Sequence, residues 1–405
     1  MSLPRLLPLV ALCLAGPGPL LAQTGEPVVQ GEKNVPGFEP AFPLQTRAPA
    51  MTSDAEFEQS VLAGPLEHPW GIAELPGGSF LVTERPGRMR SVTADGTISD
   101  PISGLPEIHA QGQGGLLDVE VGPTFAEDRL IYWTYAKPME GGRSVTAVGR
   151  GVLSEDLASL TEVEDIFVQD PPSPTSMHYG SRIIFDQNGL AFITTGEHSS
   201  LEERVFAQDL DKTYGKVIRV RPDGSAPEDN PFVGQADAID TIWSYGHRNI
   251  QGADIHPETG EIWTLEHGPK GGDELNQPEA GLNYGWPVIS YGERYSGQPI
   301  GAGETARDGM EQPVYYWDPV IAPGGFIFYS GDAFPDWQGD VLAGSLYPGA
   351  LVRLEMDGET VVGEERLLRD IGRVRDVEQT SDGRVLLLTD EPNGEIIVLA
   401  PSSSS

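Results

Sequence analysis

The chain has 405 residues, which is enough for two average domains or for one large all-β domain. Its 50 glycines and 35 prolines are spread between recurring apolar runs, a composition typical of many short strands joined by turns and not of a disordered tract. A formal net charge of −35 disfavours nucleic acid and anionic membrane surfaces as partners, and it favours cations such as calcium.

The first 22 residues have the pattern of a secretory signal. Arg5 is the only charged residue among the first 25, an apolar core follows at residues 6–15, and Gly16-Pro17-Gly18-Pro19 ends it before a small-residue cleavage site. This core is too short and too interrupted for a membrane-spanning helix, so we expect a signal peptide over residues 1–22 and not a retained anchor. The mature protein is then exported without membrane insertion, into the periplasm if the source is a Gram-negative bacterium. The single cysteine, Cys13, lies in this segment, so the mature chain has no disulfide and no thiolate ligand.

The segments on either side of the main repeat have little periodicity. Residues 23–55 are rich in proline, which predicts an arm lying on the surface, and the serine run within residues 401–405 predicts a disordered tail. Only residues 53–62 and 202–210 have a spacing typical of helices. Strand and helix patterns do not alternate, which argues against a doubly wound α/β fold.

One local pattern recurs between residues 56 and 400. A turn with glycine precedes an apolar strand that ends in Thr or an acidic residue, at residues 76–84, 186–195, 258–266 and 381–390. Hairpin signals repeated at multiples of about 50–70 residues are typical of propeller blades. The sequence therefore predicts an all-β domain, a six-bladed β-propeller over residues 56–400. Propellers bring loops of different blades together at one end of a channel, so residues far apart in the sequence can share a site.

His178 and Glu197 flank the strand of the second copy. Histidine can act as a general base near neutral pH, and a neighbouring carboxylate would orient and polarise the imidazole. We expect strand and loop to return Glu197 beside His178. Taken alone, such a histidine is more often structural.

A dense polar motif follows at residues 245–252, and it contains Arg248, Asn249 and Gln251. A guanidinium is a planar fork of donors that suits a carboxylate or a quinone oxygen, although an isolated arginine is usually an ion-pair residue. Gln251 is expected to be a supporting amide.

Gly268 and Pro269 form a tight turn after this motif. Glycine lets backbone carbonyls turn towards a cation and proline stiffens the turn, while ligation by oxygen alone suits calcium better than a transition metal. Without the neighbouring motifs this would be an ordinary loop. Asp273 and Glu274 either support the loop or are solvated.

Three further candidates lie outside these motifs. Arg373 and Arg375 are two positions apart in an extended segment, so both guanidinium groups lie on one face and can hold a tricarboxylate, unless that face is simply solvated. Gln113 lies in a glycine-rich stretch that lacks the spacing and the following helix of a dinucleotide site. Trp317 is either an aromatic wall of the site or a core residue.

These motifs resemble the soluble quinoprotein sugar dehydrogenases, the glucose/sorbosone dehydrogenase family, over roughly residues 60–400. The resemblance rests on separated motifs in the family's order, which are Gly112-Gln113-Gly114-Gly115-Leu116-Leu117, the His178-x-Gly-x-Arg182 segment, residues 245–252, Gly268-Pro269 and Arg373-x-Arg375-Asp376. Within the family, the likeness is to the broad-range aldose dehydrogenases. It implies oxidation of an aldose at the anomeric carbon to a lactone with pyrroloquinoline quinone (PQQ) and Ca²⁺, and transfer of the electrons to an unidentified acceptor.

The resemblance also implies roles for the candidate residues. His178 takes the hydroxyl proton while hydride passes to the quinone, Glu197 orients His178, and Arg248 stabilises the negative oxygen that develops. Cofactor contacts are implied for Gln113, Arg248, Asn249, Trp317, Arg373 and Arg375. The carbonyls of Gly268 and Pro269 are implied to hold Ca²⁺.

One position departs from the family's pattern. Leu346-Tyr347 stands where the family usually has Leu-Lys, whose lysine contacts a cofactor carboxylate. Losing one charge-assisted contact costs about 1.5–3 kcal/mol, or about tenfold to a hundredfold in affinity. Arg373 and Arg375 are candidates to compensate.

Two other functions are compatible with a propeller. One is a non-catalytic propeller that binds glycans or a protein, and the other is a lactonase-type propeller with a metal held by carboxylates and an amide. The oligomeric state expected is a monomer or a homodimer.

Overall fold

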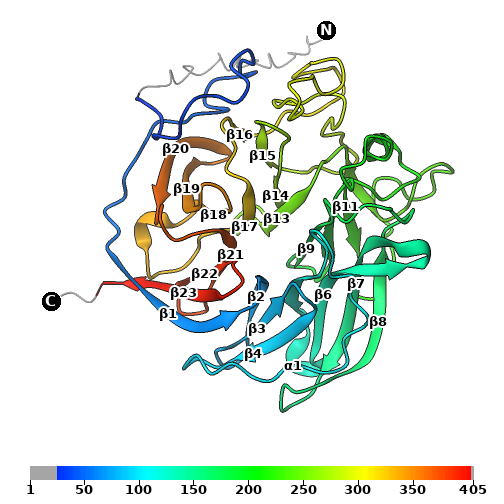
Figure 1. Cartoon of the computed structure of the whole chain (residues 1–405), viewed down its shortest axis with the longest axis vertical. Helices are drawn as coiled ribbons and strands as arrows, with labels where there is room; N and C mark the ends of the chain where they lie inside the picture. The colour runs from blue at the N-terminus through cyan, green and yellow to red at the C-terminus, as the bar shows by residue number, and fades with distance from the viewer. Residues whose placement is uncertain (1–24, 403–405) are drawn as a thin grey trace, which may run out of the picture.

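The computed structural model describes residues 25–402. In that part of the chain, 23 strands form six antiparallel sheets, which are arranged as blades around a central channel (Figure 1). This confirms the predicted six-bladed β-propeller. The predicted signal peptide lies outside the described residues, as do residues 403–405 of the predicted tail. No helix of the described residues is long and apolar enough to cross a membrane.

The blades follow one another along the chain. From the channel outwards, blade 1 contains β2 (Pro69–Leu75), β3 (Ser79–Glu84) and β4 (Arg88–Val92). Blade 2 contains β5 (Leu116–Val121), β6 (Leu130–Met139), β7 (Arg143–Leu153) and β8 (Leu160–Val168). Blade 3 contains β9 (Gly180–Phe185), β10 (Ala191–Thr195), β11 (Lys216–Val220) and β12 (Ile242–Tyr245). Blade 4 contains β13 (Ile250–Ile255), β14 (Ile262–Glu266), β15 (Asp273–Asn276) and β16 (Tyr315–Trp317). Blade 5 contains β17 (Pro323–Phe328), β18 (Val341–Ser345), β19 (Ala350–Asp357) and β20 (Thr360–Leu367). Blade 6 contains β21 (Val374–Gln379), β22 (Val385–Thr389), β23 (Gly394–Pro401) and, outermost, β1 (Phe57–Leu66). The innermost strands contact their neighbours in a closed ring.

The ring closes in blade 6, where the first strand of the chain pairs with the last. β1 runs antiparallel to β23, with Phe57 opposite Pro401, so the strand extends into the first residue of the predicted tail. The helix expected over residues 53–62 is therefore wrong, because this segment becomes a strand through a partner at the other end of the chain. Residues 202–210 contain only the short 3₁₀ helix η2 (Arg204–Gln208). The remaining helical turns are α1 (Phe125–Asp128), η1 (Glu140–Gly142) and η3 (Pro335–Trp337).

Residues 25–56 run along the outside of blades 4 and 5 (dark blue in Figure 1). Thr46 forms an isolated bridge with Tyr316 on β16, and Ala50 forms one with Glu364 on β20. The Val35 amide donates a hydrogen bond of 3.0 Å to the Asp318 carboxylate. The arm thus ties two blades together at their outer edges.

The four sequence copies all become the second strand of a blade. They form β3, β10, β14 and β22 of blades 1, 3, 4 and 6. The second strands of blades 2 and 5 lack the same turn, since α1 precedes β6 and η3 precedes β18. The hydrophobic core is divided in the same way, because a separate cluster of buried side chains fills each of the six interfaces between adjacent blades.

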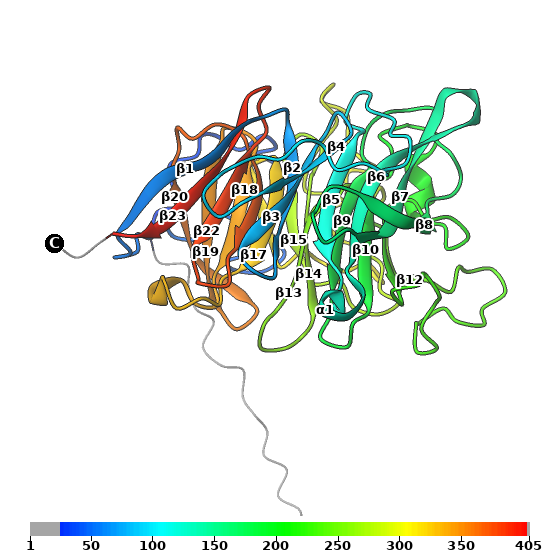
Figure 2. The ribbon, with the colours of Figure 1, turned by 90° about the horizontal axis from the view of Figure 1, so that it is seen from below.

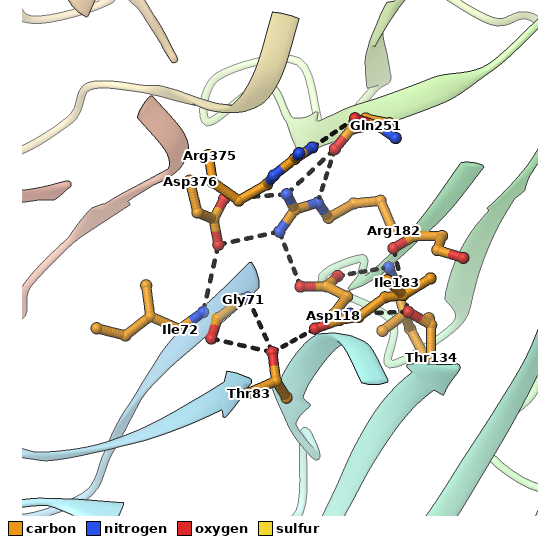
Figure 3. A network of polar contacts seen from close by, with 12 residues as sticks. Gly71, Ile72, Thr83, Asp118, Thr134, Arg182, Ile183, Gln251, Arg375 and Asp376 are labelled. Carbon is orange, nitrogen blue, oxygen red and sulfur yellow. Dashed lines mark hydrogen bonds and ion pairs between the residues drawn. The ribbon is translucent and has the colours of Figure 1, made fainter. Parts of the chain in front are cut away.

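The guanidinium of Arg182 on β9 joins the inner strands across the channel (Figure 3). Its Nη1 lies 2.8 Å from the Asp118 carboxylate on β5, and its Nη2 lies 3.0 Å from the Asp376 carboxylate on β21. Its Nε and Nη2 donate to the Gln251 carbonyl of β13, at 3.2 and 3.1 Å. The Trp70 ring on β2 lies 4.9 Å away. Five blades therefore meet at a single buried cation.

The sixth inner strand, β17, contributes a glycine at this point. A Cβ on Gly325 would lie 1.9 Å from the Asp376 carboxylate and 2.7 Å from Arg182 Nη2. No side chain fits there without displacing the ion pair. The ion pairs of Arg182 thus constrain all six inner strands.

We expect Arg182→Met to lower the free energy of unfolding by about 3–5 kcal/mol, because it leaves two buried carboxylates without a cation. Burial raises the pKa of Asp376, so at low pH the orphaned carboxyls can take up protons. The loss of stability should therefore be larger at pH 8 than at pH 5, as measured by urea unfolding. The control is Arg384→Met, which removes an exposed pair with Asp382 and should cost less than about 1 kcal/mol. A loss of under 1 kcal/mol for Arg182→Met, or a larger loss at pH 5, would contradict this account.

Candidate active site

A cavity of about 420 Å³ opens at one end of the channel. Three of its lining residues lie directly before the first strand of a blade, namely Asn249, Ala322 and Arg373, and His178 lies two residues before β9. Others directly follow the second strand, namely Arg85, His267, Leu346 and Asp390. Antiparallel pairing puts the start of one strand beside the end of the next, so both sets lie at the same edge of their blades. In Figure 2 the β22–β23 and β6–β7 turns rise on one side of the disc and the β13–β14 turn lies on the other.

His178 and Glu197 meet in this cavity. His178 Nδ1 lies 2.7 Å from Glu197 Oε1, and the Ser199 amide holds the other carboxylate oxygen at 3.0 Å. The backbone of His178 has φ +48° and donates its N–H to Gln113 Oε1 at 2.8 Å. The imidazole is thus fixed through Nδ1, which leaves Nε2 for a ligand.

Burial sets the charge of this pair. Desolvation, with the nearby positive charges of Arg248 and Arg204, holds the pKa of His178 well below its ordinary 6.5. Burial raises the pKa of Glu197 to about 7, against the opposing effect of the same arginines. The imidazole is therefore neutral near neutral pH, and Glu197 loses its proton there.

Arg248 and Asn249 lie beside the histidine. Arg248 Nη1 donates to the His267 carbonyl at 2.7 Å, and its guanidinium lies 5.2 Å from the centre of the Trp286 ring. The Asn249 side chain accepts the Gly180 N–H at 3.0 Å, which ties it to the start of β9. Both side chains are positioned by backbone groups and line the cavity.

Arg373 and Arg375 face a shared carboxylate. Their Nη2 atoms lie 3.4 and 2.5 Å from Asp390 Oδ2. Arg375 Nη1 also donates to Gln251 Oε1 at 2.7 Å, and the same oxygen lies 3.0 Å from His267 Nε2. Asp390 thereby fixes both guanidinium groups, and the Gln251 amide supports that of Arg375.

Gly268 lines the cavity, and Pro269 lines a smaller neighbouring pocket that shares Arg248, His267 and Gly268 with it. The Gly268 N–H donates to Asp273 Oδ1 at 2.8 Å, and Asp273 Oδ2 accepts the amides of Ile321 and Ala322 at 2.8 and 2.7 Å. A Cβ on Gly268 would lie 2.1 Å from the Gly272 carbonyl, so this turn requires glycine. Asp273 therefore supports the loop. The described residues contain no cluster of three or more His, Cys, Asp or Glu side chains that could hold a metal ion.

One position differs from expectation. Trp317 lies in the hydrophobic cluster between blades 4 and 5 and does not line the cavity, because β16 is the outermost strand of its blade. The tryptophan at the cavity is Trp70 of the innermost strand β2. Tyr347 is 68% exposed, next to the lining residue Leu346.

Sequence reasoning missed Arg85 and Asp390 as site residues. Both directly follow a copy of the repeated strand, at the position that His267 occupies after β14. The aligned repeats therefore contained part of the signal, since the residue after β3, β14 and β22 lines the cavity, whereas Gly196 after β10 does not.

The cavity has the opposite charge to the rest of the chain. It is lined by four arginines, Arg85, Arg248, Arg373 and Arg375, and by a single carboxylate, Asp390. The Nε atoms of Arg85, Arg248 and Arg375 are buried without a hydrogen-bond partner among the described residues. Three net positive charges within a chain of net charge −35 define a site for a multiply charged anion.

A six-bladed propeller with a histidine–carboxylate pair and this cationic cavity is the architecture of a quinoprotein-type dehydrogenase. Comparison with known proteins gives the family: residues 66–398 match the Glucose / Sorbosone dehydrogenase model, and the chain belongs to that family. It is thus an oxidoreductase of the sugar dehydrogenase class.

Individual relatives agree with this assignment. The chain is 43% identical over 345 residues to aldose sugar dehydrogenase YliI of Escherichia coli, covering 84% of this chain and 92% of that protein. The apo-form structure of the soluble aldose sugar dehydrogenase (Asd) from Escherichia coli is 42% identical, with a TM-score of 0.82, over 85% of this chain and 99% of that one. The PQQ-bound form of aldose sugar dehydrogenase (Adh) from Streptomyces coelicolor is 26% identical, with a TM-score of 0.71, over 86% and 99% of the two chains.

We expect the His178 ring to stay neutral as the pH falls from 8 through 6.5, because burial and the nearby arginines hold its pKa well below that ordinary value. Above about pH 7 the ionised Glu197 carboxylate accepts a hydrogen bond from Nδ1–H. Below that pH the protonated carboxyl donates to Nδ1 instead, so the single ring proton should move to Nε2. NMR of ¹⁵N-histidine-labelled protein measures both ring nitrogens, and a His178→Gln sample assigns the signal. A doubly protonated ring appearing with a midpoint near 6.5 would contradict the geometry.

Proposed function

We propose that this protein is an exported, PQQ-dependent and calcium-assisted dehydrogenase that oxidises aldose sugars at the anomeric carbon to lactones. The observation that supports this best is the cavity, in which three net positive charges lie next to a neutral histidine that is hydrogen-bonded to a carboxylate. PQQ has three carboxylates, so its charge matches that of the cavity. When bound, it supplies the quinone that accepts the hydride.

The chain's own residues fit the rest of this chemistry. Free Nε2 of His178 takes the proton of the substrate hydroxyl, while Glu197 holds Nδ1 and stabilises the imidazolium that forms. Arg248 presents its guanidinium beside this pair, where it can stabilise a developing oxyanion. Arg373 and Arg375 would hold carboxylates of the cofactor, and Asn249 and Gln113 complete the polar wall of the cavity.

The calcium would be held by the carbonyls of Gly268 and Pro269. Among the described residues nothing donates a hydrogen bond to the Gly268 carbonyl, and the Asp273 contacts fix the turn from behind. Backbone oxygens on a rigid turn suit a hard cation of this size. The ion would add positive charge to the same cavity and so favour an anionic cofactor.

Turnover should require both PQQ and Ca²⁺. The purified mature protein, stripped with a chelator, is mixed with aldoses and an artificial electron acceptor, and acceptor reduction is followed by absorbance. We expect turnover with PQQ and Ca²⁺ together and none with either alone.

His178→Ala gives the matched control for this assay. It removes the base and leaves the arginines intact, so turnover should vanish while PQQ still binds with nearly wild-type affinity. Full activity in this variant, or wild-type turnover without quinone, would contradict the proposal.

The pH dependence should follow Glu197. Below about pH 7 the protonated carboxyl donates to Nδ1, which places the ring proton on Nε2 and removes the base, so kcat/KM should rise with pH through about 7. Glu197→Gln should lower kcat by about 10²–10⁴-fold and abolish this rise. Glu202→Gln, at an exposed neighbour that does not line the cavity, should change neither. A profile with the same rise in Glu197→Gln would assign the titration to another group.

A further inference from the structure

Arg85 is the one cavity arginine of the described residues that pairs with no carboxylate and contacts no aromatic ring. Its Nη1 donates to the Gly112 carbonyl at 2.7 Å, which is its only side-chain hydrogen bond among the described residues. Its Nε is buried and unpartnered. Arg373 and Arg375 instead pair with Asp390, and Arg248 stacks on Trp286.

The glycine-rich loop at residues 112–115 fixes the Arg85 side chain. A Cβ on Gly115, which has φ +157°, would lie 2.1 Å from the Arg85 carbonyl and 2.5 Å from its Cγ. The Leu116 amide donates to the Arg85 carbonyl at 3.1 Å. The hydrogen bond to Gly112 therefore holds the guanidinium from one side, and Gly115 leaves room for the Arg85 backbone and the base of its side chain.

Arg85 also belongs to a cluster with excess positive charge. The like charges of Arg373 and Arg85 add to the burial that lowers the pKa of Arg375. Asp390 is the only carboxylate that lines the cavity with these three arginines, and it already binds Arg373, Arg375 and His68. Two positive charges of the cluster are thus uncompensated, and an anion in the cavity would relieve their repulsion.

We propose that Arg85 contacts a carboxylate of the bound cofactor and supplies, from blade 1, a cationic contact that Tyr347 of blade 5 does not supply. This inference rests on the proposed function, because it takes PQQ as the anion. Tyr347 has no charge to offer and is largely exposed. Arg85 has the free donors that a carboxylate accepts.

The test is the affinity of the mature protein for PQQ in the presence of Ca²⁺, measured by quenching of tryptophan fluorescence at several salt concentrations. Arg85→Gln removes the charge but keeps a donor for the Gly112 carbonyl, whereas Arg85→Lys keeps the charge. The control is Arg384→Gln, which also removes one positive charge. Arg384 pairs with Asp382 just before β22, whereas Asp390 of the cavity directly follows that strand. Tyr347→Lys introduces the missing cation.

We expect Arg85→Gln to weaken PQQ binding by about ten- to a hundredfold and to make the affinity less dependent on salt. Arg85→Lys should stay within severalfold of the wild type, and Arg384→Gln should bind as the wild type does. Adding Tyr347→Lys to Arg85→Gln should recover much of the lost affinity.

Two results would overturn the inference while leaving the proposed function intact. One is wild-type affinity in Arg85→Gln. The other is an equal loss in Arg85→Gln and Arg85→Lys with the salt dependence of the wild type, which would mean that Arg85 acts only by holding the Gly112 loop. A wild-type protein that binds no PQQ would overturn the proposed function and this inference with it.

Discussion

The ion pairs of Arg182 are the constraint on which the rest of the structure depends. A propeller has no central core, so its inner strands need polar contacts where they meet around the channel. Arg182 bonds or stacks with residues of four other blades, and Gly325 of the remaining blade leaves the space that the pair with Asp376 needs. A charge buried in this way is costly unless its partners are held in place, which makes the arrangement intolerant of shifts between blades.

This constraint connects the fold to the site. Arg182 lies four residues after His178 and bonds the carbonyl of Gln251, whose side chain supports Arg375 and His267. Asp376, its partner on β21, directly follows Arg375. Gln251 and Arg375, which line the cavity, are therefore attached to the same network that sets the spacing of the blades (Figure 3). The cavity can keep several like charges together because this network fixes the strands that bear them.

Part of this was predictable from the sequence. Glycine turns before apolar strands marked the second strands of four blades, since local turn chemistry is written in neighbouring residues. The histidine–carboxylate pair and the two arginines could be expected to converge, because strand ends at one edge of a propeller share a site. The aligned repeats also point to Arg85 and Asp390, because each directly follows the second strand of its blade.

Other features depend on contacts between distant segments. β1 was expected to be helical because its pairing with β23 is fixed by ring closure and not by its own residues. Trp317 was expected at the site, yet its strand is the outermost of blade 4, a position that no local pattern reveals. The charge balance of the cavity likewise emerged only when the lining residues were seen together.

The most direct test of the account is a crystal structure of the mature protein grown with PQQ and Ca²⁺. The account predicts the cofactor in the 420 Å³ cavity, with carboxylates on the arginines and the cation on the carbonyls of Gly268 and Pro269. PQQ bound elsewhere, or a cation held only by side-chain carboxylates outside this cavity, would contradict it.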